Sequence, residues 1–186
     1  GLGEHGFAAY LETDSGCFLF DTGTGQTLVH NAAVYGKDLR NIDKILISHG
    51  HLDHTGGLPA VLRLQESIPV LGHPDMLLQR FRKHGERLVY NGIPYTKGYL
   101  EGLGARFEFN IGALELTRDA YLTGEIPRKT VFEEGDIENR FAEREGLVVP
   151  EIVADDQALF IRSSKGLVVL LGCAHAGMMN TLNHIQ

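Results

Sequence analysis

Short apolar runs alternate with polar turn residues along most of the chain, and this pattern predicts buried strands interspersed with helices. An apolar run of four to eight residues that ends at turn residues is typical of a buried strand. Residues 7–13 and 17–20 are two such runs on either side of residues 14–16, and they predict a β-hairpin. Further strands are predicted at residues 44–48, 68–73, 105–110, 113–117, 158–163 and 167–172, with a turn between the last two.

Between several of these runs, apolar residues recur with the spacing of a helix. Leu58, Val61 and Leu62 follow the i, i+3, i+4 pattern of an apolar helical stripe, so residues 56–65 predict a helix. We expect a charged loop or lid insertion around residues 130–150, because its charges and glycines interrupt any regular pattern. Further helices are predicted at residues 26–36, 74–85 and 175–186. The alternation favours one layered α/β domain over residues 1–186, with mixed sheets.

Composition narrows the classes of partner. The chain has 186 residues, a hydrophobic fraction of 43% and a formal net charge of −7. An acidic balance argues against a general polyanion binder, so we expect no nucleic-acid partner. No apolar stretch reaches the roughly 20 residues of a spanning helix, and the two cysteines lie far apart. These features favour a cytoplasmic protein that acts on a small molecule without a membrane partner, while the oligomeric state stays open.

A cluster of side chains that can bind metals directly follows the strand predicted at residues 44–48. His49, His51, Asp53 and His54 fall within six residues, a pattern that chance would give in about one chain in a thousand of this composition. In extended backbone, His49 and His51 point the same way, so both can reach one cation. The turn into the next helix redirects Asp53 and His54, which can serve a second cation. Imidazole and carboxylate ligands suit Zn, with Fe and Mn as alternatives.

The His-x-His-x-Asp-His pattern of residues 49–54 resembles the signature of the metallo-β-lactamase-fold superfamily. The segment of residues 19–23 with Asp21, and residues 170–177 with His175, resemble that family's first and third motifs. The resemblance implies an αββα sandwich with a dinuclear metal site between the sheet edges. The family's last histidine, on a strand further downstream, has no counterpart among these residues. We therefore expect the fold to be incomplete at its C-terminal end, and the source of that ligand and of a bridging acid stays open.

Carried over to this chain, the resemblance implies a role for each matching residue. His49, His51 and His175 would hold the first divalent metal, while Asp53 and His54 would help to hold the second. Asp53 would also orient a hydroxide made from metal-bound water, since two cations lower the pKa of a shared water towards 7. Asp21 would accept a hydrogen bond that orients one of the ligands.

Four shorter segments resemble one branch of that family. They are residues 4–7, 123–128, 155–159 and 172–177. The branch is described around 7,8-dihydropterin-6-yl-methyl-4-(β-D-ribofuranosyl)aminobenzene 5'-phosphate synthase, and many members are known only as metal-dependent hydrolases. The leading expectation is a metal-dependent hydrolase of a phosphoester or related ester. The alternatives are a transferase of pterin biosynthesis that acts on a phosphoribosyl substrate, and a non-catalytic metal-binding domain.

Three further residues have two interpretations each. Arg128 could clamp a substrate phosphate through its planar guanidinium, or form a plain ion pair with Glu125. His5 could border the site and contact substrate, or be a surface histidine. Cys173 could approach the metal, but a small buried thiol is the favoured interpretation.

Overall fold

The computed structural model describes residues 1–133 and 137–186, and the strands of that part of the chain form three sheets. The first sheet has the strand order β1-β2-β3-β4-β7. Its first pair is the predicted antiparallel hairpin, and its other neighbours are parallel. The strands are β1 (Ala9–Thr13), β2 (Gly16–Phe20), β3 (Lys44–Leu46), β4 (Ile68–Gly72) and β7 (Ala105–Phe109).

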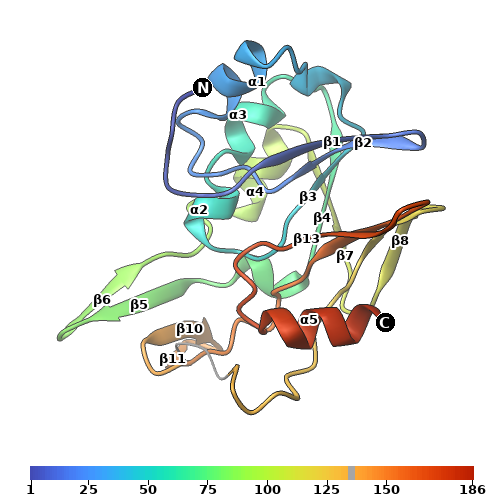
Figure 1. Ribbon diagram of the computed structural model, residues 1–186. Coiled ribbons are helices and arrows are strands. Elements are labelled where there is room, and N and C mark those ends of the chain that lie inside the picture. The colour runs from blue at the N-terminus through green and yellow to red at the C-terminus, as the bar shows by residue number, and fades with distance from the viewer. Residues whose placement is uncertain (134–136) are drawn as a thin grey trace.

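Helices connect the parallel strands, as parallel pairing requires a crossover of this kind. In Figure 1 these helices gather on one side of the first sheet. They are α1 (Leu28–Val34), α2 (Leu52–Thr55), α3 (Leu58–Leu62) and α4 (Lys97–Gly102), with a short 3₁₀ turn at Leu39–Asn41. The sequence predicted the helices that contain α1 and α3, each over a somewhat longer range.

The second sheet is antiparallel and has the strand order β13-β12-β9-β8. It lies on the side of the first sheet that the helices α1 to α4 leave uncovered (Figure 1). The predicted turn before Gly166 joins β12 and β13, whose ends pair at Ser163 and Gly166. Helix α5 (Met178–Ile185) follows on the far side of the molecule from α1 and α3 (Figure 1). The strands are β8 (Leu114–Thr117), β9 (Ala120–Leu122), β12 (Leu159–Ser163) and β13 (Gly166–Leu170).

The third sheet corrects two predictions. Only the 3₁₀ turn Pro74–Leu77 is helical in the segment predicted as a helix over 74–85, and β5 (Arg80–His84) follows it. The segment predicted as a charged loop contains β10 (Arg140–Arg144) and β11 (Leu147–Pro150), although residues 134–136 within it lie outside the described residues. The sheet order is β11-β10-β5-β6, with β6 at Arg87–Tyr90.

Both errors have the same physical cause. Strand β5 pairs with β10, whose residues lie about sixty positions further along the chain, and local sequence patterns do not reveal such a partner. Gly85 turns the chain between β5 and β6 with φ of 57°, a left-handed conformation that suits glycine. The fully buried Ala142 shows that β10 is packed rather than solvated.

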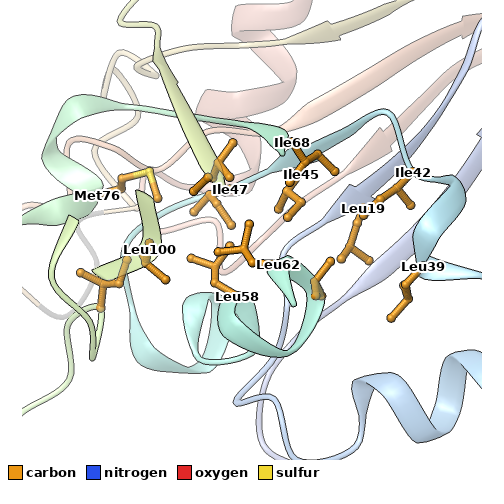
Figure 2. Packing of buried hydrophobic residues seen from close by; sticks show 14 residues of the cluster. Leu19, Leu39, Ile42, Ile45, Ile47, Leu58, Leu62, Ile68, Met76 and Leu100 are labelled. Carbon is orange, nitrogen blue, oxygen red and sulfur yellow. The ribbon is translucent and has the colours of Figure 1, made fainter. Parts of the chain in front are cut away.

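Two hydrophobic cores separate the helices, the first sheet and the second sheet, and α5 follows the second sheet as the fourth layer. The first lies between the helices and the first sheet, where Leu58 and Leu62 of α3 face Ile45 and Ile47 (Figure 2). The second lies between the two sheets. It joins Phe18, Phe20, Leu46 and Leu71 of the first sheet to Ala120, Leu122 and Leu159 of the other. The αββα sandwich implied by the resemblance is therefore the observed fold. Among the described residues no helix is long and apolar enough to cross a membrane.

The packing of α3 can be tested with two neighbouring leucines. Leu62 is fully buried in the first core, whereas Leu64 is 40% exposed. We expect Leu62→Ala to lower the free energy of unfolding by about 2–5 kcal/mol, since it removes buried methyl groups and leaves a cavity. Leu64→Ala should cost about 0.5 kcal/mol or less. Urea unfolding followed by circular dichroism measures both, and equal losses would contradict the assignment of the core.

Candidate metal centre

Three histidine rings meet where the two central sheets approach each other. His49 and His51 lie in the loop that leaves β3, and His175 lies in the loop that leaves β13. The His49 Nε2 and His51 Nδ1 atoms are 2.9 Å apart, and His175 Nε2 lies 3.2 Å from each of them. Three ring nitrogens from two distant segments therefore point at one another.

These nitrogens have the spacing and the protonation state of metal ligands. Ligands placed tetrahedrally at 2.0–2.1 Å from a Zn ion lie about 3.3 Å from one another, close to the distances observed here. Burial lowers the pKa of His49 well below its usual value, and the neighbouring imidazoles add to this effect. Burial likewise lowers the pKa of His51 to about 3 and that of His175 to about 2. All three rings are therefore neutral at pH 7 and can offer lone pairs, so the donor set fits a divalent metal.

A buried carboxylate orients two rings of the centre. Asp21 directly follows β2 and is fully buried, with φ of 59°, which is uncommon for a residue with a side chain. Its Oδ1 atom accepts the backbone N–H of Ser48 at 2.7 Å, and its Oδ2 atom lies 2.6 Å from Ser48 Oγ and 2.7 Å from His54 Nδ1. The Ser48 hydroxyl in turn lies 2.9 Å from His49 Nδ1. The sequence indicated Asp21 but not Ser48, which links this carboxylate to His49.

Asp53 and His54 form the second part of the site. The Nε2 atom of His54 lies 3.5 Å from Asp53 Oδ2 and 3.1 Å from Cys173 Sγ. Burial alone would lower the pKa of His54, but the hydrogen bonds to Asp21, Asp53 and Cys173 outweigh burial and raise it to about 12. Burial would raise the pKa of Asp53, but the adjacent His54 outweighs it and lowers that pKa to about 2. The prediction of a small buried thiol was wrong, since Cys173 is exposed.

The centre opens into a cavity of about 460 Å³. His5 lines this cavity, as one sequence interpretation expected, and its Nε2 atom lies 3.2 Å from Asp53 Oδ2. Arg82 of β5 and Arg140 of β10 pair across adjacent strands and also line the cavity, where Arg140 donates to His175 Nδ1. The sequence missed both arginines because their strands were predicted as helix and loop. The remaining lining residues are Thr24, His51, Leu52, Asp53, Asn91, Cys173 and His175.

Arg128 occupies another position. Its guanidinium donates to the backbone carbonyls of His175, Ile152 and Val153, and the residue does not line the cavity that holds the histidines. Burial lowers its pKa from the usual value of arginine. The predicted phosphate clamp thus has no support in the geometry, and Arg128 instead holds the loop that carries His175.

Buried ion pairs of Arg80 stabilise the loop that carries His49 and His51. Arg80 is fully buried, and its Nη2 atom lies 2.6 Å from Asp155 Oδ1, while its Nε atom donates to Glu151 at 2.7 Å. Asp155 Oδ2 accepts the N–H of Gly50 at 2.8 Å. A Cβ atom on Gly50 would lie 2.1 Å from the Met76 carbonyl oxygen, so only glycine fits between the two histidines. No local pattern in the sequence indicates that Arg80 is buried, because arginine is mostly a surface residue and its two acidic partners lie far along the chain.

Comparison with known proteins agrees with this geometry. The family model described as the metallo-beta-lactamase superfamily matches residues 2–176. A 7,8-dihydropterin-6-methyl-4-(beta-D-ribofuranosyl)-aminobenzene-5'-phosphate synthase of Methanocaldococcus jannaschii is 30% identical over 95% of the chain, which spans 63% of that protein.

Solved structures give the same fold. Tm1679, described as a metal-dependent hydrolase of the beta-lactamase superfamily, is 32% identical with a TM-score of 0.77, over 98% of this chain and 64% of that one. A quorum-quenching N-acyl homoserine lactone lactonase is 20% identical with a TM-score of 0.51, over 86% of this chain and 57% of that one, and shares the fold alone.

The four histidines should titrate differently in the metal-free protein. We expect His54 to keep its proton up to about pH 9, whereas His51 and His175 stay neutral above pH 5, because their pKa values move in opposite directions. The pKa of His49 is likewise lowered by burial, so this ring should also be neutral at pH 7. Long-range ¹H–¹⁵N NMR spectra of the histidine rings between pH 5 and 9 measure this. A His54 ring that loses its proton near pH 6.5 would contradict the buried Asp21–His54 pair.

The variant Asp21→Asn tests whether the charge of Asp21 raises the pKa of His54. It keeps the shape of the side chain but removes its charge, so the pKa of His54 should fall. A folded-state pKa raised above 6.5 stabilises the fold fully below pH 6.5, and this contribution is lost as the pH rises towards 12. The difference in unfolding free energy between wild type and Asp21→Asn should therefore shrink above pH 6.5. A difference that grows with pH would show that His54 is not charged in the fold.

Proposed function

The chain belongs to the metallo-β-lactamase superfamily, and from this premise we propose that it is a metal-dependent hydrolase of an anionic ester, with a phosphoester as the leading candidate. The observation that carries the proposal is the convergence of three neutral histidine nitrogens, 2.9–3.2 Å apart, beside a cavity lined by two arginines. Neither feature alone would indicate this chemistry. Together they support a metal site next to groups suited to bind an anion.

The residues divide into two adjoining sets. His49, His51 and His175 would hold one divalent ion, and Asp53 and His54 would help to hold a second. When bound, such ions polarise an ester oxygen and lower the pKa of a water towards 7. We favour Zn at the all-nitrogen set, with Fe or Mn as alternatives. Asp53, whose carboxylate is ionised at neutral pH, is suited to accept a hydrogen bond from water and so to orient it towards the substrate.

The arginines suggest the charge of the substrate. Arg82 and Arg140 stand on neighbouring strands at the wall of the cavity, and a guanidinium presents a planar set of donors that matches phosphate oxygens. The His5 side chain is 86% exposed, lines the cavity and lies 3.2 Å from Asp53 Oδ2, so it could contact substrate there. A cavity of about 460 Å³ suits a small molecule rather than a polymer.

A second candidate is a transferase of pterin biosynthesis that acts on a phosphoribosyl substrate. The identity of 30% over 95% of the chain to the synthase of Methanocaldococcus jannaschii favours it. The same arginines would then bind the 5'-phosphate of one co-substrate. Hydrolysis ranks first because the solved relative at 32% identity is described as a metal-dependent hydrolase.

Turnover of a generic phosphodiester separates the two candidates. The protein loaded with Zn, Mn or Fe(II) should hydrolyse bis(p-nitrophenyl) phosphate with no pterin present. Silence on this substrate, followed by product formation with a pterin and an aminobenzene ribofuranosyl phosphate together, would favour transfer. Metal binding without turnover in either assay would contradict both and favour a non-catalytic metal-binding domain.

The predicted role of the arginines has its own test. Arg82→Gln should lower kcat/KM for the phosphodiester by about tenfold or more, because a hydrogen bond to a charged group contributes about 1.5–3 kcal/mol. Arg87→Gln is the control, since Arg87 is exposed on the neighbouring strand β6 and does not line the cavity. Steady-state rates of both variants measure the effect. Equal activities would remove Arg82 from the substrate site.

A further inference from the structure

The surroundings of His54 Nε2 point to a ligand that the family signature does not include. The Nδ1 atom of His54 lies 2.7 Å from Asp21 Oδ2, so only Nε2 is directed towards the site. The Cys173 Sγ atom lies 3.1 Å from this nitrogen, and Asp53 Oδ2 lies 3.5 Å from it. We propose that Cys173 supplies a thiolate ligand to the metal bound beside His54. This inference rests on the metal centre of the proposed function.

Two overlapping groups of donor atoms support two adjacent metal positions. His49, His51 and His175 form one group, and His49, His54 and Cys173 form the other, with the ligand atoms of each group within 4.8 Å of one another. His49 belongs to both groups, so the two positions are neighbours. The second group has its own donors, His54 and Cys173, that the first does not use.

The loop after β13 explains why a cysteine lies there. Cys173 and His175 are two residues apart, and Ala174 between them has φ of 50°. The backbone turns at Ala174, so the same loop that brings His175 to one group brings the thiol to the other. Asp156 fixes this loop by accepting the N–H of Ala176 at 2.8 Å, and Arg128 binds the carbonyl of His175.

Distance and access agree with coordination by sulfur. A Zn ion with bonds of about 2.3 Å to sulfur and about 2.0–2.1 Å to nitrogen separates the two donors by roughly 3.5 Å in tetrahedral geometry. The observed 3.1 Å therefore needs only a small adjustment. Cys173 is exposed and lines the cavity, so an ion that enters the cavity can reach its sulfur. A thiolate would make this position favour Zn or Fe over Mg or Mn.

Cobalt substitution tests the proposal through a signal other than activity. A thiolate bound to Co(II) gives a charge-transfer band in the near ultraviolet, whereas histidine and carboxylate ligands give only the visible d–d bands. The chain has two cysteines, so Cys17→Ser is the matched control, and Cys17 lies in β2, half-buried and outside the cavity. We expect the band in wild type and Cys17→Ser, and its loss in Cys173→Ser with the d–d bands retained.

The outcomes distinguish the role of Cys173 as a ligand from the existence of the metal centre itself. Cobalt d–d bands without a charge-transfer band in wild type, or a band that persists in Cys173→Ser, would overturn the role of Cys173 and leave the metal centre intact. Failure of wild type to bind any cobalt would overturn the metal centre as well. A second measurement follows the thiol directly: in Cys17→Ser, bound cobalt should slow the reaction of Cys173 with a thiol reagent. An unchanged rate would again contradict coordination.

Discussion

The buried carboxylate of Asp21 is the constraint on which the metal centre depends. A carboxylate without contact to water must have its lone pairs satisfied, and Asp21 accepts hydrogen bonds from the Ser48 amide, the Ser48 hydroxyl and the His54 ring. These contacts join the end of β2 to the loop after β3 and to helix α2. They also engage the Nδ1 atom of His54 directly and that of His49 through the Ser48 hydroxyl, so the Nε2 atoms of both rings are directed into the site. The fold and the centre are therefore stabilised by the same interaction.

A second set of contacts places the ligand that comes from the other sheet. The segment before β12 carries Asp155, Asp156 and Gln157, all buried. Asp155 accepts the amide of Gly50, and the side chain of Gln157 donates to the carbonyl of Ile47, so both hold the loop after β3. Asp156 accepts the amide of Ala176 and holds the loop after β13, although burial raises its pKa to about 6. One short segment thus sets the position of His175 relative to the other two histidines.

The sequence predicted those parts of the protein that local patterns specify. The hairpin β1–β2 and helix α3 follow from apolar periodicity, and the six residues from His49 to His54 stand out because their spacing is local. The fold class followed from a resemblance over most of the chain. Arg80, Arg82 and Arg140 could not be found in this way, because their positions depend on the pairing of β5 with the distant strand β10. The prediction that Cys173 is buried was wrong, and this residue stands beside a left-handed turn at Ala174 that no residue preference indicates.

The proposed metal centre depends on the convergence of His49, His51 and His175, and the metal content per chain shows whether these rings are ligands. Elemental analysis should find close to two divalent ions per wild-type chain and at least one fewer in His51→Ala, because that variant removes one of three nitrogens from the first position. His30→Ala is the control, since His30 lies exposed on α1 and should leave the content unchanged. Equal metal content in wild type and His51→Ala would contradict the assignment of these histidines as ligands.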